Sequence, residues 1–418
     1  MISERSIEYV NGSKFGSQFR RPLYESYGFA SIPRSIPALL GEGELALPKD
    51  VLGALPRSYN KVALFFFDSF GWRFYEQFST HPLIDVLTKE GAVSKLTSQF
   101  PSTTAANLTT INTGKPVGEH GIYEWNYYEP VVDSVIASLP FAFPGDNSRG
   151  SLAQIGVEPH DIFPNDNIYQ ELSKKGIVSH IFLHGEIAYS PYSSVLTRGA
   201  VIHLYNTLKE GLANLDTQLK TDKRGYYFFY FGNFDSVCHE YGPDSKEAEA
   251  EGVAILNTIE RAFFDTKKLK DILFLMAADH GQVQTPENQC HYINIELSGI
   301  VPMIKTTADG QPIVPAGSPR DFFLHIRDES LLDAQSLLQN HLDGIAQVEL
   351  VSDLEKRCFF GKDVSATFKS RVGNLVILPF GNYSVWWYEE NRFSMKDAGN
   401  HGGLTPEEMD VPLCVLSF

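Results

Sequence analysis

Three stretches of the 418-residue chain share one pattern, a run of apolar residues that ends in an acidic residue. They are KVALFFFD, which ends at Asp68, GYYFFYFGNFD, which ends at Asp235, and DILFLMAADHG, which contains Asp279 and His280. Such runs predict buried strands of a mostly parallel sheet, and the helix-like segment 245–269 makes the last two a strand–helix–strand unit. Because sites in open α/β sheets form at the carboxyl ends of strands, we expect the three acids to meet at one edge.

The rest of the chain completes an α/β prediction, a mostly parallel central sheet flanked by helices, with an inserted small α+β subdomain. Residues 1–58 are rich in Gly, Pro, Ser and aromatic residues and predict an N-terminal arm packed on the core. Residues 59–282 and 394–418 are predicted to form the catalytic core, because the chain ends in another apolar strand, VPLCVLSF. Residues 283–393 contain short strands and amphipathic pieces and are expected to form the inserted subdomain.

Composition excludes some classes of partner. The chain has 35 Lys and Arg against 51 Asp and Glu, a net charge of −16, which argues against a nucleic-acid polymer as partner. The N-terminus has no apolar core typical of a secretory signal, and no run approaches the roughly 20 apolar residues of a membrane span. We therefore expect a cytoplasmic protein without a membrane partner. Four scattered cysteines without a CxxC spacing fit reduced thiols: Cys238, Cys290, Cys358 and Cys414.

The loops after the predicted strands hold three carboxylates and three imidazoles: Asp68, Asp235, Asp279, His239, His280 and His401. This mixed oxygen and nitrogen set suits Zn²⁺ or Mn²⁺ better than Ca²⁺ or Mg²⁺. Six ligands are too many for one tetrahedral ion, whereas two sets of three leave open positions on two ions. His120, in GEHGI, has a similar setting and is expected only to stabilise a turn.

The stretch SQFPSTTAANLTTINTG places three consecutive hydroxyls, Ser102, Thr103 and Thr104, before a helix-like run that Gly114 closes. Hydroxyls at a helix start usually cap the first backbone N–H groups. Composition and spacing do not choose among the three as a nucleophile.

Five segments carry a resemblance to a known family. FFFDSFG, FPSTTAANLTTINTGKPVGEHGI, FGNFDSVCHEYGP, AADHG and GNHGGLTPEEMDVPL follow one another from about residue 60 to 418. In this order they resemble the alkaline phosphatase superfamily, and within it the type I phosphodiesterase/nucleotide pyrophosphatase family. The resemblance implies an alkaline phosphatase-like core. It also implies a two-metal hydrolase that cleaves phosphodiester or pyrophosphate bonds of small nucleotide-type molecules through a phospho-threonine intermediate.

The resemblance also assigns residues. It implies two ions, most simply Zn²⁺ with Mn²⁺ as the alternative, and two sets of ligands: Asp235, His239 and His401, and Asp68, Asp279 and His280 with the nucleophile. The nucleophile is the third residue after Pro101, which is Thr104. An asparagine beyond the nucleophile helix should donate to a phosphoryl oxygen. Asn126 matches it with a displacement of about one position, and Asn107 competes.

Relatives with other activities differ in their basic residues. Phosphomonoesterases bind the extra phosphoryl charge with a nearby cation, and no Lys or Arg lies between Pro101 and Gly114, although Arg320 or Arg392 of the subdomain could supply one. A phosphonoacetate-type hydrolase should carry lysines after the nucleophile loop, where HGIYEWNYYEPVVDS has none. A non-catalytic metal-containing binding protein is the alternative of another class.

Overall fold

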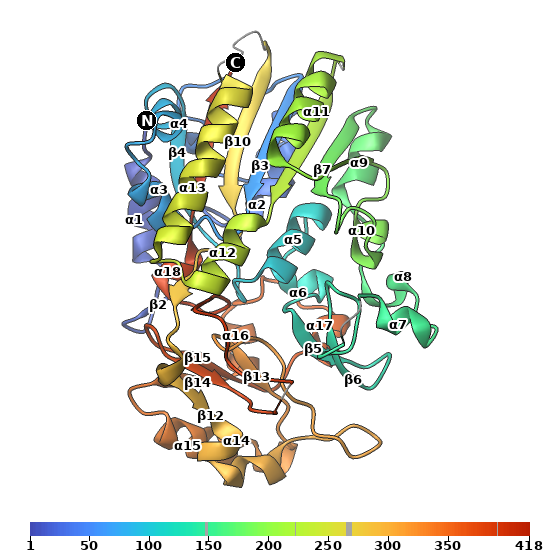
Figure 1. The fold of residues 1–418 in the computed structure, drawn as a ribbon, viewed down its shortest axis with the longest axis vertical. Coiled ribbons are helices and arrows are strands. Elements are labelled where there is room, and N and C mark those ends of the chain that lie inside the picture. The colour runs from blue at the N-terminus through green and yellow to red at the C-terminus, as the bar shows by residue number, and fades with distance from the viewer. Residues whose placement is uncertain (147–148, 222, 265–269, 391) are drawn as a thin grey trace.

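A seven-stranded sheet runs through the molecule in the order β4–β18–β10–β3–β9–β7–β8 (Figure 1). The structure is a computed structural model that describes residues 1–418 except 147–148, 222, 265–269 and 391. The strands of this sheet are β3 (Lys61–Phe67), β4 (Ala92–Thr97), β7 (Val178–His184), β8 (Val201–Tyr205), β9 (Gly225–Phe231), β10 (Ile272–Ala278) and β18 (Asp410–Ser417). The five strands from β10 to β8 pair in parallel, and β18 is antiparallel to both neighbours.

Helices cover both faces of the sheet. Every residue of β9 and of β10 is buried, and since side chains alternate between faces, neither face is open to water. One helical layer contains α4 (Pro82–Glu90), α11 (Leu208–Thr221) and α13 (Lys246–Ile259), and another contains α2 (Ser31–Leu39), α5 (Thr104–Thr113) and α9 (Ile168–Lys174). The predicted α/β class is therefore confirmed. The end of the predicted helix, residues 265–269, lies outside the described residues.

The three acid-bearing strands are neighbours in the order β10–β3–β9. Phe67 pairs with Ala278 on one side and with Phe231 on the other, so the three strands end at the same level. The segment after each strand therefore begins at one edge of the sheet. After β9 the chain turns at once into α12 (Asn233–Tyr241).

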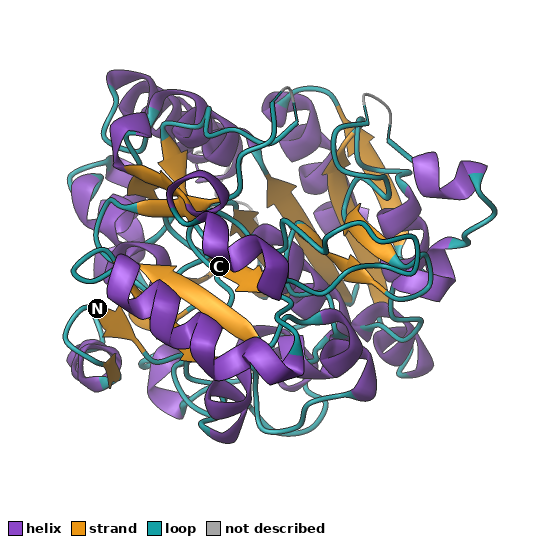
Figure 2. Ribbon diagram, turned by 90° about the horizontal axis from the view of Figure 1, so that it is seen from below, coloured by secondary structure: helices purple, strands orange, loops and turns teal. Residues whose placement is uncertain are grey.

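A second, smaller group of elements lies beyond the carboxyl ends of these strands, at the bottom of Figure 1 and toward the viewer in Figure 2. It contains the antiparallel sheet β13–β15–β14 and α15 (Leu331–His341), with β13 (Phe322–Leu324), β14 (Ala346–Leu350) and β15 (Leu375–Pro379). Leu375 and Ile377 of β15 belong to a separate apolar core, whereas the alternating residues Val376 and Leu378 pack into the main core. The strand alternation thus joins this sheet to the body of the protein.

The remaining elements are short. The paired strands are β1 (Lys14–Phe15) with β2 (Phe19–Arg20), β5 (Asn126–Glu129) with β6 (Ser134–Ala137), β11 (Val283–Gln284) with β17 (Gly399–Asn400), and β12 (Cys290–Tyr292) with β16 (Ser384–Trp386). The remaining α-helices are α1 (Glu4–Gly12), α3 (Trp72–Gln77), α6 (Val117–His120), α7 (Ser151–Gln154), α8 (Pro159–Ile162), α10 (Pro191–Leu196), α14 (Ile293–Glu296), α16 (Val351–Lys356), α17 (Ala366–Arg371) and α18 (Pro406–Met409).

The N-terminal segment lies along the edge strand β4. Ser3 N–H donates to Val93 O at 2.8 Å, and Thr97 N–H donates to Tyr27 O at 2.8 Å. The four cysteines are free thiols. Among the described residues, no helix combines the length and the apolar character that a membrane crossing requires.

A buried ion pair joins the small sheet to the core. Arg320, just before β13, donates from Nε and Nη2 to the two carboxylate oxygens of Glu408 in α18, at 3.0 Å each, and both side chains are fully buried. Glu408 also accepts from Gly403 N–H at 3.0 Å and from the Thr405 hydroxyl at 2.7 Å. Glu408 therefore connects Arg320, beside the small sheet, to Gly403 and Thr405 in the loop that contains His401.

We predict that Arg320→Met lowers the free energy of unfolding by about 3–5 kcal/mol, because it leaves the Glu408 carboxylate buried without its cation. Urea denaturation measures the change. Lys89→Met is the matched control, since it removes the exposed pair of Lys89 with Asp85 and should hardly move the midpoint. Equal midpoints for Arg320→Met and the wild type would contradict the role of the buried pair.

Candidate active site

The acids and histidines singled out in the sequence come together beyond the carboxyl ends of β3, β9 and β10. Asp68 follows β3, and Asp279 and His280 follow β10. Asp235 and His239 lie one turn apart on α12, and His401 follows β17. The level ends of β3, β9 and β10 bring the three acids to one place, and the pairing of β17 with β11, just after β10, brings His401 there.

The first group consists of Asp68, Asp279 and His280, whose ligand atoms all lie within 4.8 Å of one another. His280 Nε2 lies 3.4 Å from Asp68 Oδ1 and 3.4 Å from Asp279 Oδ2. Asp279 Oδ1 accepts the backbone N–H groups of Ser69 at 3.0 Å and of His280 at 2.9 Å. Asp279 Oδ2 is buried and has no hydrogen-bond donor among the described residues, so this oxygen is available for a cation.

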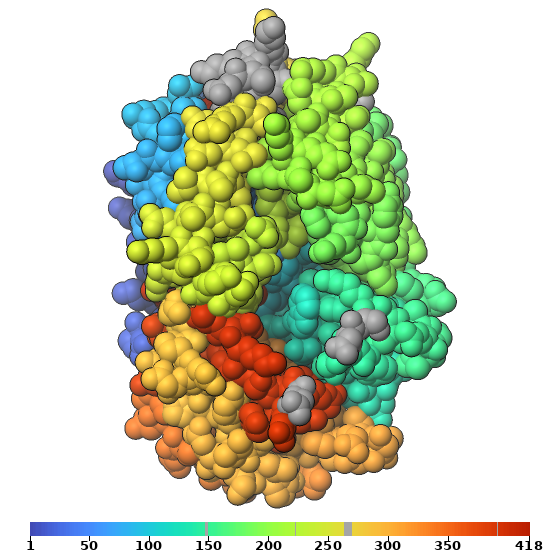
Figure 3. All heavy atoms as spheres, viewed as in Figure 1, coloured from blue at the N-terminus to red at the C-terminus, as the bar shows by residue number. Residues whose placement is uncertain are grey.

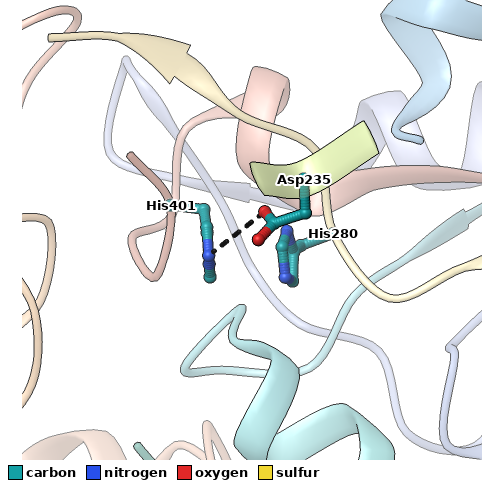
Figure 4. Close-up of side chains that lie close together, drawn as sticks. All are labelled: Asp235, His280 and His401. Atoms are coloured by element: carbon teal, nitrogen blue, oxygen red, sulfur yellow. Dashed lines mark ion pairs between the residues drawn. The ribbon is translucent and has the colours of Figure 1, made fainter. Parts of the chain in front are cut away.

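The second group consists of Asp235, His280 and His401, again within 4.8 Å (Figure 4). His401 Nε2 lies 3.7 Å from Asp235 Oδ1, and the rings of His280 and His401 stack with centroids 3.6 Å apart. The predicted second set contained His239 in place of His280. His239 Nε2 lies 3.4 Å from Asp235 Oδ2, and its ring centroid is 5.1 Å from that of His401. His239 is thus in reach of Asp235, and His280 adjoins both groups.

Backbone carbonyls orient all three histidines in the same way. The Nδ1 atoms of His239, His280 and His401 hydrogen-bond to carbonyl oxygens of Gly399 at 2.8 Å, Gly281 at 3.1 Å and Ser102 at 3.0 Å. A carbonyl only accepts, so each Nδ1 carries a proton, and each Nε2 faces the acids. Neutral imidazole with a free Nε2 is the form that binds metal ions.

Burial sets the charge state of the cluster. Burial, together with the charges of Asp279 and Asp235, raises the pKa of Asp68 well above its usual range. Burial and the neighbouring His280 and His239 lower the pKa of His401. Three carboxylates crowded in a buried place repel one another unless a cation lies between them. The donor set, the orphan oxygen of Asp279 and the imidazole Nε2 atoms that face the acids therefore fit divalent metal ions.

The three consecutive hydroxyls at the start of α5 have different surroundings. Ser102 donates to Gly403 O at 2.8 Å, and Thr103 is the N-cap of α5, accepting from Ala106 N–H at 3.3 Å. Thr104, the first residue of α5, places Oγ1 3.2 Å from Asp68 Oδ1 and 3.1 Å from His280 Nε2. Of the three hydroxyls, only that of Thr104 adjoins the acids and histidines.

The two candidate asparagines are also separated by the structure. Asn107 is fully buried inside α5, where its amide donates to Thr103 O at 3.0 Å and to Ser98 Oγ at 3.1 Å. Asn126 is half-buried at the start of β5 and lines the same cavity as Thr104. Asn126 is accordingly the one that faces the space where a substrate would lie. His120 is buried and accepts Ile122 N–H at 3.1 Å, in keeping with a role in a turn.

Two cavities meet at Thr104, in the hollow between α12 and the teal and red regions of Figure 3. The first, about 650 Å³, follows the carboxyl ends of β9 and β7 and has apolar walls that include Leu108, Ile181 and Phe228. The second, about 930 Å³, lies toward the small sheet and includes Asn126, His239, His401, Arg392 and Lys396. Arg320 is locked to Glu408 and lines neither cavity, so of the two arginines considered from the sequence only Arg392 adjoins the site.

Two residues near the acids were missed by the sequence analysis. The Tyr230 hydroxyl donates to Asp68 Oδ2, and Gln282 Nε2 donates to Asp235 Oδ1 at 2.6 Å. Tyr230 is an ordinary aromatic residue of a buried strand by composition, and only the strand register shows what it faces. Gln282 stands two residues after His280, which is a signal that could have been used.

A pair of buried carboxyl groups adjoins the second cavity. Glu124 Oε2 accepts the Trp125 N–H, and Asp321 Oδ1 accepts Ser318 N–H at 3.0 Å and the Ser318 hydroxyl. Burial raises the pKa of Glu124, and burial together with the charge of Glu124 raises the pKa of Asp321. Glu124 Oε1 and Asp321 Oδ2 are buried and have no hydrogen-bond partner among the described residues, so burial favours the neutral form of these carboxyl groups.

Comparisons with known proteins agree with the resemblance. A family model for "Type I phosphodiesterase / nucleotide pyrophosphatase" matches residues 62–404. The mouse protein "Ectonucleotide pyrophosphatase/phosphodiesterase family member 7" is 26% identical over 245 residues, 56% of this chain and 53% of the mouse protein. The human protein of that name is 26% identical over 234 residues, 54% and 48% of the two chains. The chain spans about half the length of the curated relatives it matches.

Solved structures share the fold. Murine ectonucleotide pyrophosphatase/phosphodiesterase 5 has a TM-score of 0.64 at 15% identity, covering 85% of this chain and 88% of the other. Its human counterpart has a TM-score of 0.65 at 16% identity with the same coverage. An inactive variant of the murine protein, in complex with AMP, has a TM-score of 0.64 at 15% identity and covers 86% and 88%.

We predict that the free energy of unfolding of Glu124→Gln falls less steeply than that of the wild type between about pH 4.5 and pH 8. Because the folded protein keeps protons on Glu124 that the unfolded chain releases as pH rises through this window, the wild type should lose free energy of unfolding as pH increases. The glutamine cannot ionise, so the variant loses less.

Thermal midpoints at several pH values, with metal in excess, measure this effect. Glu8→Gln on the exposed side of α1 is the control and should follow the wild type. A Glu124→Gln slope that equals the wild-type slope would show that Glu124 does not keep its proton.

Proposed function

The chain belongs to the type I phosphodiesterase/nucleotide pyrophosphatase family, and on this premise we propose that it hydrolyses phosphodiester or pyrophosphate bonds in small nucleotide-type molecules. The observation that carries the proposal is the position of Thr104, whose hydroxyl adjoins Asp68 and His280 where two cavities meet. An AMP complex of a protein with the same fold supports the choice of nucleotides.

Seven side chains would hold the metal pair that the family implies: Asp68, Thr104, Asp235, His239, Asp279, His280 and His401. Two divalent ions, which we propose to be Zn²⁺ with Mn²⁺ as the alternative, supply positive charge that lowers the pKa of a hydroxyl and neutralises phosphoryl oxygens. The six Asp and His side chains offer three carboxylates and three neutral imidazoles, a donor set of the chemistry that these ions prefer.

The chain's own residues then orient the reaction. Thr104 stands at the N-terminus of α5, where free backbone N–H groups and the helix dipole favour an anionic phosphate. Attack forms the bond from Thr104 Oγ1 to phosphorus and breaks the bond to the leaving-group oxygen, which takes up the proton that the hydroxyl loses. Water then hydrolyses the phospho-threonine. Asn126, on the wall of the second cavity, is the proposed donor to a phosphoryl oxygen.

The two cavities favour a substrate with a substituent on each side of the phosphorus. A diester places one group in each, whereas a monoester leaves one of them filled only by water. The apolar walls of the 650 Å³ cavity suit a base or another largely apolar group. A phosphonoacetate-type hydrolase, a phosphomonoesterase and a non-catalytic metal-containing protein are the competing assignments that the next experiments separate.

We predict that Thr104→Ala lowers kcat by at least about 1,000-fold, because the nucleophile is lost while the acids and histidines remain. Metal content by elemental analysis should stay near that of the wild type. Thr103→Ala is the control, since it removes only a helix cap at a cost of about 1 kcal/mol in stability. Near wild-type turnover by Thr104→Ala would refute the nucleophile, and two bound metals without turnover by the wild type would favour a binding protein.

We predict that kcat/KM for bis-p-nitrophenyl phosphate exceeds that for p-nitrophenyl phosphate by about 10-fold or more, equal to about 1.4 kcal/mol. The nucleophile loop has no basic side chain for a third phosphoryl charge, and Arg320 is occupied by Glu408. Both assays use the same Zn²⁺-loaded protein. Equal cleavage of the monoester would contradict the diesterase assignment. The variants Arg392→Ala and Lys396→Ala would then show whether these residues bind the monoester.

A further inference from the structure

Tyr230 is the penultimate residue of β9, and its position follows from the sheet register. Tyr230 pairs with Phe66 of the adjacent parallel strand β3. Side chains two residues apart on a strand point to the same face, so Phe66 and Asp68 share the face on which Tyr230 lies. The phenol therefore extends past the Phe66 ring, at a centroid distance of 6.1 Å, and reaches the Asp68 carboxylate.

The two carboxylate oxygens of Asp68 have different partners. Asp68 Oδ2 accepts the Tyr230 hydroxyl. Asp68 Oδ1 lies closer than Oδ2 to the Thr104 hydroxyl, at 3.2 Å against 3.5 Å, and lies 3.4 Å from His280 Nε2. A carboxylate without such a donor can rotate about its Cβ–Cγ bond and exchange its oxygens, whereas a hydrogen-bonded one keeps a fixed orientation.

The donor itself is firmly held. The Tyr205 hydroxyl donates to the backbone oxygen of Tyr230 at 2.6 Å, and Asp68 N–H donates to the backbone oxygen of Phe231 at 2.9 Å. Both members of the hydrogen bond are thus attached to the same pair of strands.

We propose that Tyr230 is a positioning residue that fixes the Asp68 carboxylate so that Oδ1 faces Thr104 and the metal ligands. The inference rests on the proposed function for its kinetic part only. Hydrogen bonds from side chains behind a metal ligand typically change metal affinity or activity by about 10–100-fold when they are removed. Tyr230 acts through Asp68 and has no role in bond making or breaking.

The test is Tyr230→Phe, which removes one hydroxyl and keeps the ring that packs beside Phe66. Tyr226→Phe is a matched control on the same strand, because the buried Tyr226 hydroxyl has no hydrogen-bond partner among the described residues. The measurements are Zn²⁺ retention in competition with a chromophoric chelator, thermal midpoint, and kcat and KM for bis-p-nitrophenyl phosphate.

For Tyr230→Phe we expect one Zn²⁺ per chain to be bound about 10–100-fold more weakly, and kcat to fall by about 10-fold or more with little change in KM. Tyr226→Phe should match the wild type in both. Tyr205→Phe, which frees the backbone oxygen of Tyr230, should weaken Zn²⁺ retention by a smaller factor and provides a second reading if Tyr230→Phe does not fold.

Wild-type Zn²⁺ affinity in Tyr230→Phe, or equal losses in Tyr230→Phe and Tyr226→Phe, would overturn the inference. The outcome for the proposed function is separate. If wild-type protein binds Zn²⁺ but cleaves no diester, and Tyr230→Phe still loses Zn²⁺ affinity, the positioning role stands while the proposed activity fails.

Discussion

The repulsion among three crowded carboxylates, two of them buried, is the constraint on which the arrangement of this protein depends. Asp68, Asp235 and Asp279 follow adjacent parallel strands, and level strand ends force them into one small volume. Taking such charges out of water costs several kcal/mol each unless cations or donors compensate. The backbone N–H groups on Asp279, the Tyr230 hydroxyl on Asp68 and the Gln282 amide on Asp235 are partial compensations, and divalent cations would supply the rest.

Much of this arrangement could be predicted from the sequence because strand ends are readable locally. Apolar runs that terminate in acids indicated both the sheet and the edge at which the acids would meet. The antiparallel direction of β18 was not readable from a short apolar run. It follows from topology, since the chain returns from the small sheet at the carboxyl edge and crosses the molecule from there. The sequence also does not show that His280 lies within reach of Asp235 and His401, because that proximity depends on how the strand ends and α12 meet.

The other contacts that the sequence did not reveal depend on sheet register or join residues that are far apart in the chain. Tyr230 and Asp68 are 162 residues apart, and only the pairing of β3 with β9 brings them together. From the sequence, Arg320 was a candidate to contact a substrate. In the structure its guanidinium binds the fully buried Glu408 carboxylate instead. Among Ser102, Thr103 and Thr104 the family resemblance selected Thr104. The structure adds a physical reason, since the other two hydroxyls are used to hold Gly403 and to cap α5.

The parts that would perform chemistry and the parts that would select a substrate come from different segments. The acids, the histidines and Thr104 follow β3, β10 and β17 or lie on α12 and α5, elements packed in or against the core. The cavity walls add Trp125, Arg392 and Lys396, which lie in connections at the surface and near the small sheet. Connections tolerate change better than core elements, because fewer buried contacts depend on them. A change of substrate could therefore proceed through the walls, while the carboxylate cluster stays fixed by the strand ends that create it.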